Sequence, residues 1–158
     1  MTDREGRFWI TYNGEIYNYR EVRDVLSTKG HCFRSNSDTE VILCSYKQWG
    51  AECLEMLNGM FAFAIWDNQT GRLFAARDRL GIKPFYYWRD DEHFVFASEI
   101  KALFKSGFVQ PEIDYDALHT PAMSTLWCIP TAAMAPRNDE RYAAVTSSEQ
   151  PLLLEYGS

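Results

Sequence analysis

The sequence lacks both the long apolar run of a membrane span and the paired ligands of a metal site. No stretch reaches the roughly 18 apolar residues that a membrane-spanning helix needs. The opening Met-Thr-Asp-Arg-Glu-Gly-Arg is charged and holds no apolar core of a secretion signal. The four cysteines form no Cys-x-x-Cys pair, and only three histidines accompany them, which argues against a zinc site. We therefore expect no metal, no membrane contact, and reduced, packed thiols in a cytoplasmic protein.

Basic residues are also outnumbered by acidic ones. The chain has 16 Lys and Arg against 22 Asp and Glu, a net charge of −6, which argues against general affinity for nucleic acid. Apolar residues make up 46% and aromatic residues 15% of the 158 positions, which is ample material for one buried core. These values exclude a wholly disordered chain and indicate one domain's worth of polypeptide.

Residue patterns predict a mixture of strands and helices. A β-branched and aromatic segment predicts a strand at 8–12, and the dipeptide Asn13-Gly14 predicts a turn that ends it. Asn18 and Glu21 are spaced as the capping box of a helix that continues to about Gly30. The other predicted elements are a short strand at 31–34, a helix from Ser37 to Trp49, a short helix at 51–57, strands at 60–66, 72–77, 84–88 and 93–97, and a helix at 99–106.

The run Met-Phe-Ala-Phe-Ala-Ile-Trp at 60–66 does not alternate with polar residues, so both faces of this strand are expected to be covered. The four strands between 60 and 97 are expected to form one antiparallel meander, because the loops between them have hairpin lengths. Prolines then interrupt the chain and no steady period follows. We expect a folded domain over 1–118 and an irregular tail over 119–158.

The segment Asn13-Gly14-Glu15 has two interpretations. It is typical of a simple turn, but an Asn amide and the next Gly N–H can also converge as two donors on the anion formed when an amide carbonyl is attacked. Asp38, in the first turn of a helix, either complements the helix dipole or binds the ammonium group of a ligand. Glu15 would assist it, because carboxylates accept hydrogen bonds from ammonium donors.

Other polar residues favour structural roles. Asp78 and the charged residues around it lie in a turn, where Asp78 can hold the loop by accepting backbone hydrogen bonds. The cysteines lie in apolar surroundings, and the histidines have no acidic or cysteine partners at recognisable spacing. Thr2 would become an N-terminal nucleophile if Met1 were removed, but no strand pattern follows it directly.

Five segments in order resemble glutamine-hydrolysing asparagine synthetases, over about residues 8–118. They are Asn-Gly-Glu-Ile-Tyr-Asn at 13–18, Ser-Asp-Thr-Glu-Val-Ile-Leu at 37–43, Leu-Asn-Gly-Met-Phe-Ala-Phe-Ala at 57–64, Ala-Arg-Asp-Arg-Leu-Gly-Ile-Lys-Pro at 76–84 and Ala-Ser-Glu-Ile-Lys-Ala-Leu at 97–103. The part that they resemble is the N-terminal glutaminase domain, a class II glutamine amidotransferase.

The resemblance implies an α+β fold of the N-terminal-nucleophile hydrolase type, a sandwich of two antiparallel sheets between helical layers. It implies that Asn13 and Gly14 form the oxyanion hole, and that Glu15 and Asp38 hold the amino group of glutamine. In this family an N-terminal cysteine attacks the glutamine amide. The ammonia then passes to a synthetase domain that activates aspartate with ATP and Mg²⁺.

The chain also departs from the family. It has no Met-Cys-Gly start, and few residues precede Asn13. We expect a domain incomplete at the N-terminus and cut at both ends, which lacks the nucleophile and is inactive alone. ATP and Mg²⁺ are expected only in the missing synthetase domain, so this chain holds no cofactor. That domain, or another protein partner, is expected to cover the open sheet edge.

Two alternatives stay open. One is a degenerate glutaminase-like binding or scaffold module, similar to the related domain of lasso-peptide cyclases. The other is a non-functional gene fragment whose tail is out of frame. The final ammonia acceptor is also open, because relatives amidate aspartate or other carboxylates.

Overall fold

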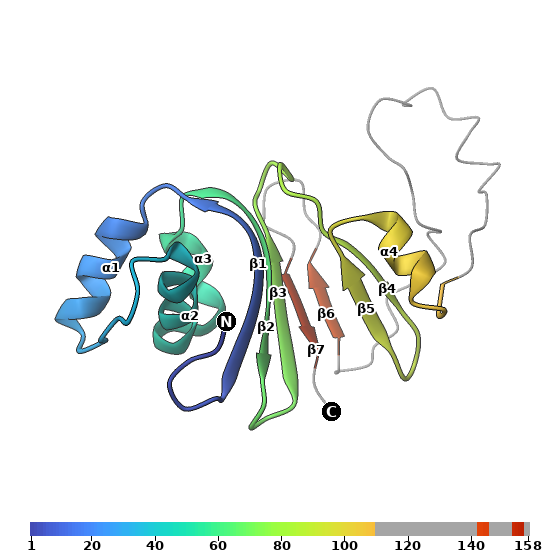
Figure 1. Ribbon diagram of the computed structural model, residues 1–158, viewed down its shortest axis with the longest axis horizontal. Helices are drawn as coiled ribbons and strands as arrows, with labels where there is room; N and C mark the ends of the chain where they lie inside the picture. The colour runs from blue at the N-terminus through green and yellow to red at the C-terminus, as the bar shows by residue number, and fades with distance from the viewer. Residues whose placement is uncertain (110–141, 146–152, 157–158) are drawn as a thin grey trace. The chain divides into compact units, whose positions relative to one another are not determined.

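The computed structural model describes residues 1–109, 142–145 and 153–156 (Figure 1). The chain divides into two units, the first made of Met1–Pro84 with Asp139–Ser158 and the second of Phe85–Asn138. The first unit holds β1 (Phe8–Ile16), α1 (Tyr19–Thr28), α2 (Asp38–Trp49), a 3₁₀ turn (Gly50–Glu52), α3 (Cys53–Met56), β2 (Gly59–Asp67), β3 (Arg72–Arg77), β6 (Tyr142–Val145) and β7 (Leu153–Tyr156). The second holds β4 (Tyr86–Arg89), β5 (Phe94–Ala97) and α4 (Ile100–Lys105).

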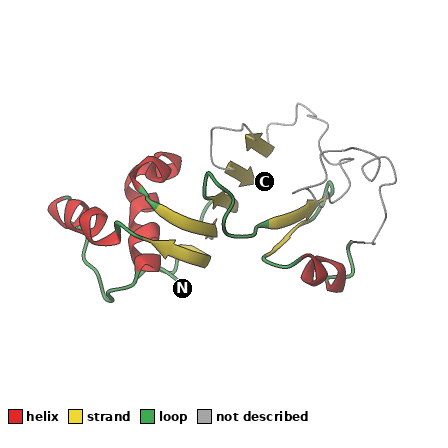
Figure 2. Cartoon of the chain, turned by 90° about the horizontal axis from the view of Figure 1, so that it is seen from above, coloured by secondary structure: helices red, strands yellow, loops and turns green. Residues whose placement is uncertain are grey.

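The first unit is layered, with helices on one side of an antiparallel sheet of order β1-β2-β3-β7-β6. Figures 1 and 2 show α2 between the sheet and α1. Ile42 and Leu43 of α2 share a buried cluster with Phe63 of β2. The other side of α2 contacts α1, where Val22 and Leu26 form the predicted apolar face. Burial of these side chains is the main stabilising contribution to the two interfaces.

The strand β2, which lies between β1 and β3, is buried on both faces, as its unbroken apolar sequence predicts. Phe63 and Ile65 point into the helix-side core, and Ala62 and Ala64 are at most 4% exposed on the opposite face. Trp66, near the end of the strand, is the exception and is exposed. Alanine at alternate positions keeps one side of the strand thin, while phenylalanine and isoleucine fill the space beneath α2.

The predicted turn at Asn13-Gly14 is wrong, because β1 runs straight through it to Ile16. All nine residues of β1 are in register with β2, and Gly14 lies opposite Phe61. A Cβ on Gly14 would collide with the Met60 carbonyl oxygen and lie 2.7 Å from the Cα of Phe61. Glycine is therefore required here by the close approach of two strands rather than by a turn.

Two further local predictions are wrong in detail. Residues 31–34 form no strand, because the Glu40 carboxylate accepts the backbone N–H groups of Arg34 and Ser35. Glu40 therefore does not complete a Ser-x-x-Glu capping box with Ser37, although Ser37 caps α2 by accepting the N–H of Thr39.

Asn18 precedes α1 but makes no capping hydrogen bond with its side chain. Its amide instead donates to the carbonyl of Met56 and accepts from the N–H of Asn58. The predicted capping box with Glu21 is therefore wrong. The amide joins the start of α1 to the connection between α3 and β2.

The outer edge of β1 is partly covered by the start of the chain. Met1 and Ile10 exchange two backbone hydrogen bonds of 2.9 Å, and the Asp3 carboxylate accepts the N–H groups of Arg7 and Phe8. This short return of the chain covers the first half of the edge and stops before Tyr12.

The predicted four-stranded meander is also wrong. β2 pairs with β3 and β4 pairs with β5, but β3 and β4 lie in different sheets. The connection between them is held by Asp78, which accepts the N–H groups of Ile82 and Lys83, so these groups are not available for a strand ladder.

The second unit is a small hairpin and a helix. Two stacked ring pairs join the strands of the hairpin. Tyr87 of β4 stacks on Phe94 of β5, and Phe85, just before β4, stacks on Phe96 of β5. Leu103 of α4 is 1% exposed. None of the described helices is long and apolar enough to cross a bilayer. Two short strands, β6 and β7, lie inside the segment expected to be irregular; its remaining residues lie outside the described ones.

Candidate functional site

The backbone of Gly14 faces the open edge of β1. In an antiparallel strand, alternate residues turn their N–H and C=O groups to opposite edges. Ile10 bonds outward to Met1, and the Ile16 N–H donates outward to the Asp38 carboxylate. Gly14 belongs to the same alternate set, so its N–H also points away from β2. No described residue accepts it.

Asp38 reaches this edge from the first residue of α2. Its Oδ2 accepts the Tyr12 hydroxyl at 2.7 Å and the Ile16 N–H at 3.2 Å. Tyr12 and Ile16 flank Gly14 along the strand, so the half-buried carboxylate and the outward N–H of Gly14 lie on the same edge of β1, with the carboxylate bound two residues farther along at Ile16. The structure thus brings together two of the four predicted site residues.

The other two predicted residues lie on a different surface. The side chains of Asn13 and Glu15 are exposed, and strand alternation places them on the sheet face opposite Tyr12. Asn13 and Glu15 are the residues directly before and after Gly14. The Glu15 carboxylate is near enough to the Tyr12 hydroxyl to influence it electrostatically.

Tyr12 is the site residue that sequence reasoning missed. Burial raises its pKa, and the hydrogen bond to Asp38 and the charges of Asp38 and Glu15 raise it further. The hydroxyl therefore stays protonated and donates at neutral pH. An aromatic residue in a strand normally indicates core packing, so the sequence gives no separate signal for this contact.

The motif around Asp78 is structural, as expected. The Asp78 side chain is buried and accepts N–H groups of Phe61, Ile82 and Lys83 at 3.3, 2.9 and 3.0 Å. Arg77 donates to the carbonyl oxygens of Gly81 and Lys83. This bonding fixes the loop while Leu80 remains 84% exposed.

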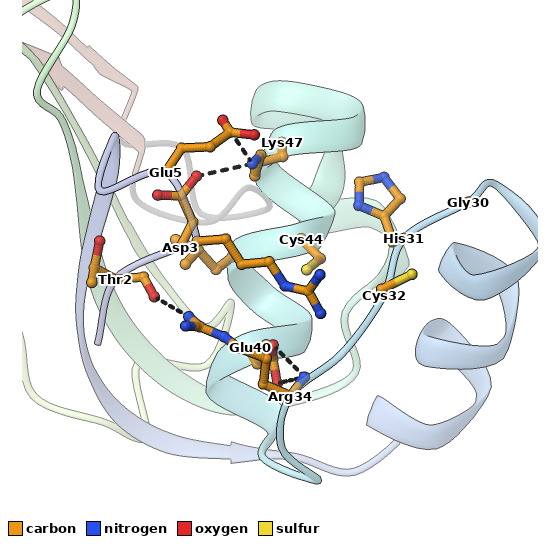
Figure 3. Close-up of a pocket in the computed structure, with 12 residues that line it drawn as sticks. Thr2, Asp3, Glu5, Gly30, His31, Cys32, Arg34, Glu40, Cys44 and Lys47 are labelled. Atoms are coloured by element: carbon orange, nitrogen blue, oxygen red, sulfur yellow. Dashed lines mark hydrogen bonds and ion pairs between the residues drawn. The ribbon is translucent and has the colours of Figure 1, made fainter.

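A pocket of about 260 Å³ lies elsewhere, between the start of the chain and α2 (Figure 3). Its charges are largely paired within the protein. Lys47 contacts Asp3 at 2.9 Å and Glu5 at 3.5 Å, and the Glu40 carboxylate is occupied by backbone N–H groups. None of the predicted site residues lines this pocket or a second one beside the Asp78 loop.

The cysteines and histidines that the structure describes have ordinary surroundings. Cys53 is fully buried, which raises its pKa to about 12, and Cys32 and Cys44 line the pocket of Figure 3. His31 hydrogen-bonds to Gln48, and His93 pairs with Asp90. Cys128 and His119 lie outside the described residues.

Comparison with solved structures defines the class of fold. Glutamine phosphoribosylpyrophosphate amidotransferase from Bacillus subtilis matches with a TM-score of 0.57 and 27% identity, over 68% of this chain and 25% of that one. The antiparallel sheets and helices together with this likeness show an α+β fold of the N-terminal-nucleophile hydrolase type. The fold class expected from the sequence is thereby confirmed.

The family follows from the sequence comparisons. A family described as glutamine amidotransferase domain matches residues 1–138. This chain belongs to that family. The match extends beyond residue 118, and the domain boundary there stays a prediction.

Two curated relatives confirm the resemblance seen in the five motifs. Glutamine-hydrolysing asparagine synthetase 3 of Bacillus subtilis is 48% identical over 111 residues, which cover 70% of this chain. Asparagine synthetase 2 of the same organism is 37% identical over 131 residues, or 83% of this chain. The chain spans only 18% and 17% of the length of these two relatives.

Proposed function

We propose that this chain forms the glutamine-binding wall of a glutaminase site. The enzyme would be of the asparagine synthetase type, in which ammonia from glutamine amidates aspartate. The observation that carries the proposal is that the outward N–H of Gly14 and the Asp38 carboxylate lie on the same edge of β1, since Asp38 accepts the outward N–H of Ile16 two residues on. One group is a donor for the oxygen of an amide, and the other is an acceptor for an ammonium group.

The spacing of these two groups suits an amino acid with a side-chain amide. Ile16, which donates to Asp38, lies two residues from Gly14, a separation of about 7 Å along a strand. This is the order of the distance between the two ends of glutamine. The Gly14 N–H and the Asn13 amide would stabilise the oxyanion, and a single such donor is typically worth about 10²–10³ in rate.

The ammonium end would be held by Asp38 with help from Glu15. The charges of both carboxylates raise the pKa of Tyr12, but the Glu15 side chain lies on the sheet face opposite Tyr12, so Glu15 would reach the ammonium group only around the open edge of β1. A charge-assisted N–H···O bond is roughly twice as strong as a neutral one. This difference would favour an amino acid over an uncharged amide.

We propose that the isolated 158-residue chain binds glutamine weakly and does not hydrolyse it. The buried, protonated Cys53 is unsuited to attack. Loss of the nucleophile in an acyl-transfer site costs on the order of 10⁶ in rate, which one or two oxyanion donors do not offset. ATP and Mg²⁺ would bind in a synthetase domain rather than here.

The remaining edge of β1 supports a proposal about partners. The backbone groups of Tyr12 and Gly14 on the outer side of the strand pair with no described residue, and an unpaired edge favours addition of another strand. A synthetase-bearing polypeptide or another protein partner would cover this edge at Tyr12 and leave the Gly14 N–H open to the glutamine amide. The three described cysteines are free thiols, which supports a cytoplasmic location.

Calorimetric titration with millimolar glutamine tests the binding proposal. We expect weak binding by the unaltered chain, loss of most of the heat in Asp38→Asn, and a smaller loss in Glu15→Gln. Asp24→Asn, an exposed change on α1, is the matched control and should bind as the unaltered chain does. Absence of heat with the unaltered chain would remove the proposed role.

An ammonia-release assay tests the proposed inactivity. The 158-residue chain with glutamine should release no more ammonia than buffer does. Turnover at an ordinary enzymatic rate would contradict the proposal and require a nucleophile among residues that we have assigned to structure.

A further inference from the structure

We propose that Tyr12 is a positioning residue that fixes the Asp38 carboxylate so that one oxygen is presented to the ammonium group of the ligand. The inference rests on the proposed function and adds a residue to its site. Its basis is the direction of two contacts. The Tyr12 hydroxyl and the Ile16 N–H both donate to Oδ2 of Asp38, at 2.7 and 3.2 Å.

This bonding divides the two carboxylate oxygens between protein and ligand. A carboxylate oxygen has two lone-pair directions, so two donors from β1 satisfy Oδ2. Oδ1 accepts no hydrogen bond from any described residue. It is therefore the oxygen of Asp38 that remains for an N–H donor from outside the chain. Two donors on one oxygen also restrict rotation of the carboxylate, which lowers the entropy lost when a ligand is bound.

Packing requires the ring of Tyr12 but not its hydroxyl. The ring lies on the helix side of β1, opposite Phe63 of β2, and packs against the buried cluster that includes Ile16 and Phe61. Phenylalanine would fill the same space. The hydroxyl therefore contributes one specific interaction, the bond to Asp38, and Tyr12→Phe removes that interaction with little change in the core.

A purely structural brace between β1 and α2 would give a different result from a positioning role. Loss of a brace lowers the stability of the protein but does not change its preference between ligands with and without an ammonium group. A positioning residue acts on the ammonium group alone. The readout is therefore the preference of the chain for glutamine over 4-carbamoylbutanoate, the same molecule without its α-amino group.

We suggest NMR titration of the 158-residue chain and its variants with both compounds. In Tyr12→Phe we expect glutamine affinity to fall about tenfold, with the affinity for 4-carbamoylbutanoate unchanged. In Asp38→Asn the preference for glutamine should disappear, and adding Tyr12→Phe to Asp38→Asn should change nothing more. Tyr17→Phe, an exposed tyrosine just beyond β1, is the matched control and should bind as the unaltered chain does.

Each other outcome is decisive. If the unaltered chain has no preference for glutamine, or if Asp38→Asn retains it, the proposed function is wrong. If Asp38→Asn loses the preference and Tyr12→Phe retains it, the proposed function stands and the positioning role is wrong. Equal weakening of both compounds in Tyr12→Phe also overturns the positioning role. Because the two compounds are compared on the same variant, a folding defect does not imitate the expected result.

Discussion

Gly14 of β1 and Gly59 of β2 lie where the two strands approach so closely that neither position has room for a side chain. The backbone of β2 excludes a Cβ on Gly14, and the backbone of β1 excludes a Cβ on Gly59. A Cβ on Gly59 would collide with the carbonyl oxygen of Glu15 and lie 2.9 Å from the Cα of Ile16. The corresponding atom on Gly14 would collide with Met60. The two glycines therefore set how closely β1 approaches β2 at the end of β1 that carries the proposed site.

Alanine at position 14 should destabilise the protein through this contact. We expect Gly14→Ala to lower the free energy of unfolding by about 1–3 kcal/mol, the usual cost of overpacking, as measured by urea denaturation. Gly6→Ala is the control, because Gly6 has a positive φ of 69° but open space around a Cβ. It should show only the conformational cost of about 1 kcal/mol. Equal effects of the two changes would show that the strand contact does not matter.

Asp78 should control how well its loop resists proteolysis. Asp78→Asn keeps the size of the side chain but replaces an acceptor oxygen with a donor, so the buried N–H of Phe61 or an N–H of Ile82 or Lys83 loses its partner. We expect a loss of about 1–3 kcal/mol and faster tryptic cleavage after Arg79. Asp91→Asn, in an exposed turn, is the control. Unchanged cleavage after Arg79 would contradict the assigned role.

Much of the fold could be predicted from local patterns. Ser37 indicates the start of α2 because capping is a local interaction, and the unbroken run at 60–66 indicates a strand buried on both faces. The turn predicted at Asn13-Gly14 failed for a non-local reason. Gly14 is required by the approach of β2, a strand more than forty residues later, and a single sequence does not reveal that contact.

The site was predictable in part. Its residues were identified through their resemblance to a family, not through local pattern, which favoured a turn at Gly14 and a helix-dipole role for Asp38. The proximity of Gly14 and Asp38 depends on the packing of α2 against the sheet. This is a tertiary contact between segments far apart in the sequence, so local patterns do not predict it. Tyr12 could not be found in this way, because its ring follows the apolar pattern of β1 and only the structure reveals the bond to Asp38.

Thiol reactivity should separate the described cysteines. Burial raises the pKa of Cys53 to about 12, so it is protonated and inaccessible near pH 8, whereas Cys32 is exposed. We expect iodoacetamide at pH 8 to modify Cys32 within minutes and Cys53 only after unfolding in urea, as measured by mass spectrometry of tryptic peptides. Modification of both at equal rates in the folded protein would contradict the assigned burial and reopen Cys53 as a nucleophile.

Asp67 should make the stability of the first unit depend on acid pH. Its carboxylate accepts two hydrogen bonds from Arg7, at 3.0 and 2.7 Å, and the side chain is 8% exposed. The bond to Arg7 lowers the pKa of Asp67 below the ordinary value of 3.8, and the N–H of Gln69 lowers it further. A lowered pKa in the folded state means that the contribution is present above the unfolded pKa and is lost as pH falls toward the folded pKa.

We therefore expect Asp67→Asn to cost about 1–2 kcal/mol at pH 7, as measured by urea denaturation. The difference from the unaltered chain should remain constant down to about pH 5 and shrink between pH 4 and pH 2, because protonation then removes the same charge from both proteins. Asp24→Asn, exposed on α1, should show no such change with pH. A difference between Asp67→Asn and the unaltered chain that stays constant from pH 7 to pH 2 would mean that the charge on Asp67 contributes nothing, and that the variant loses packing or neutral hydrogen bonds instead.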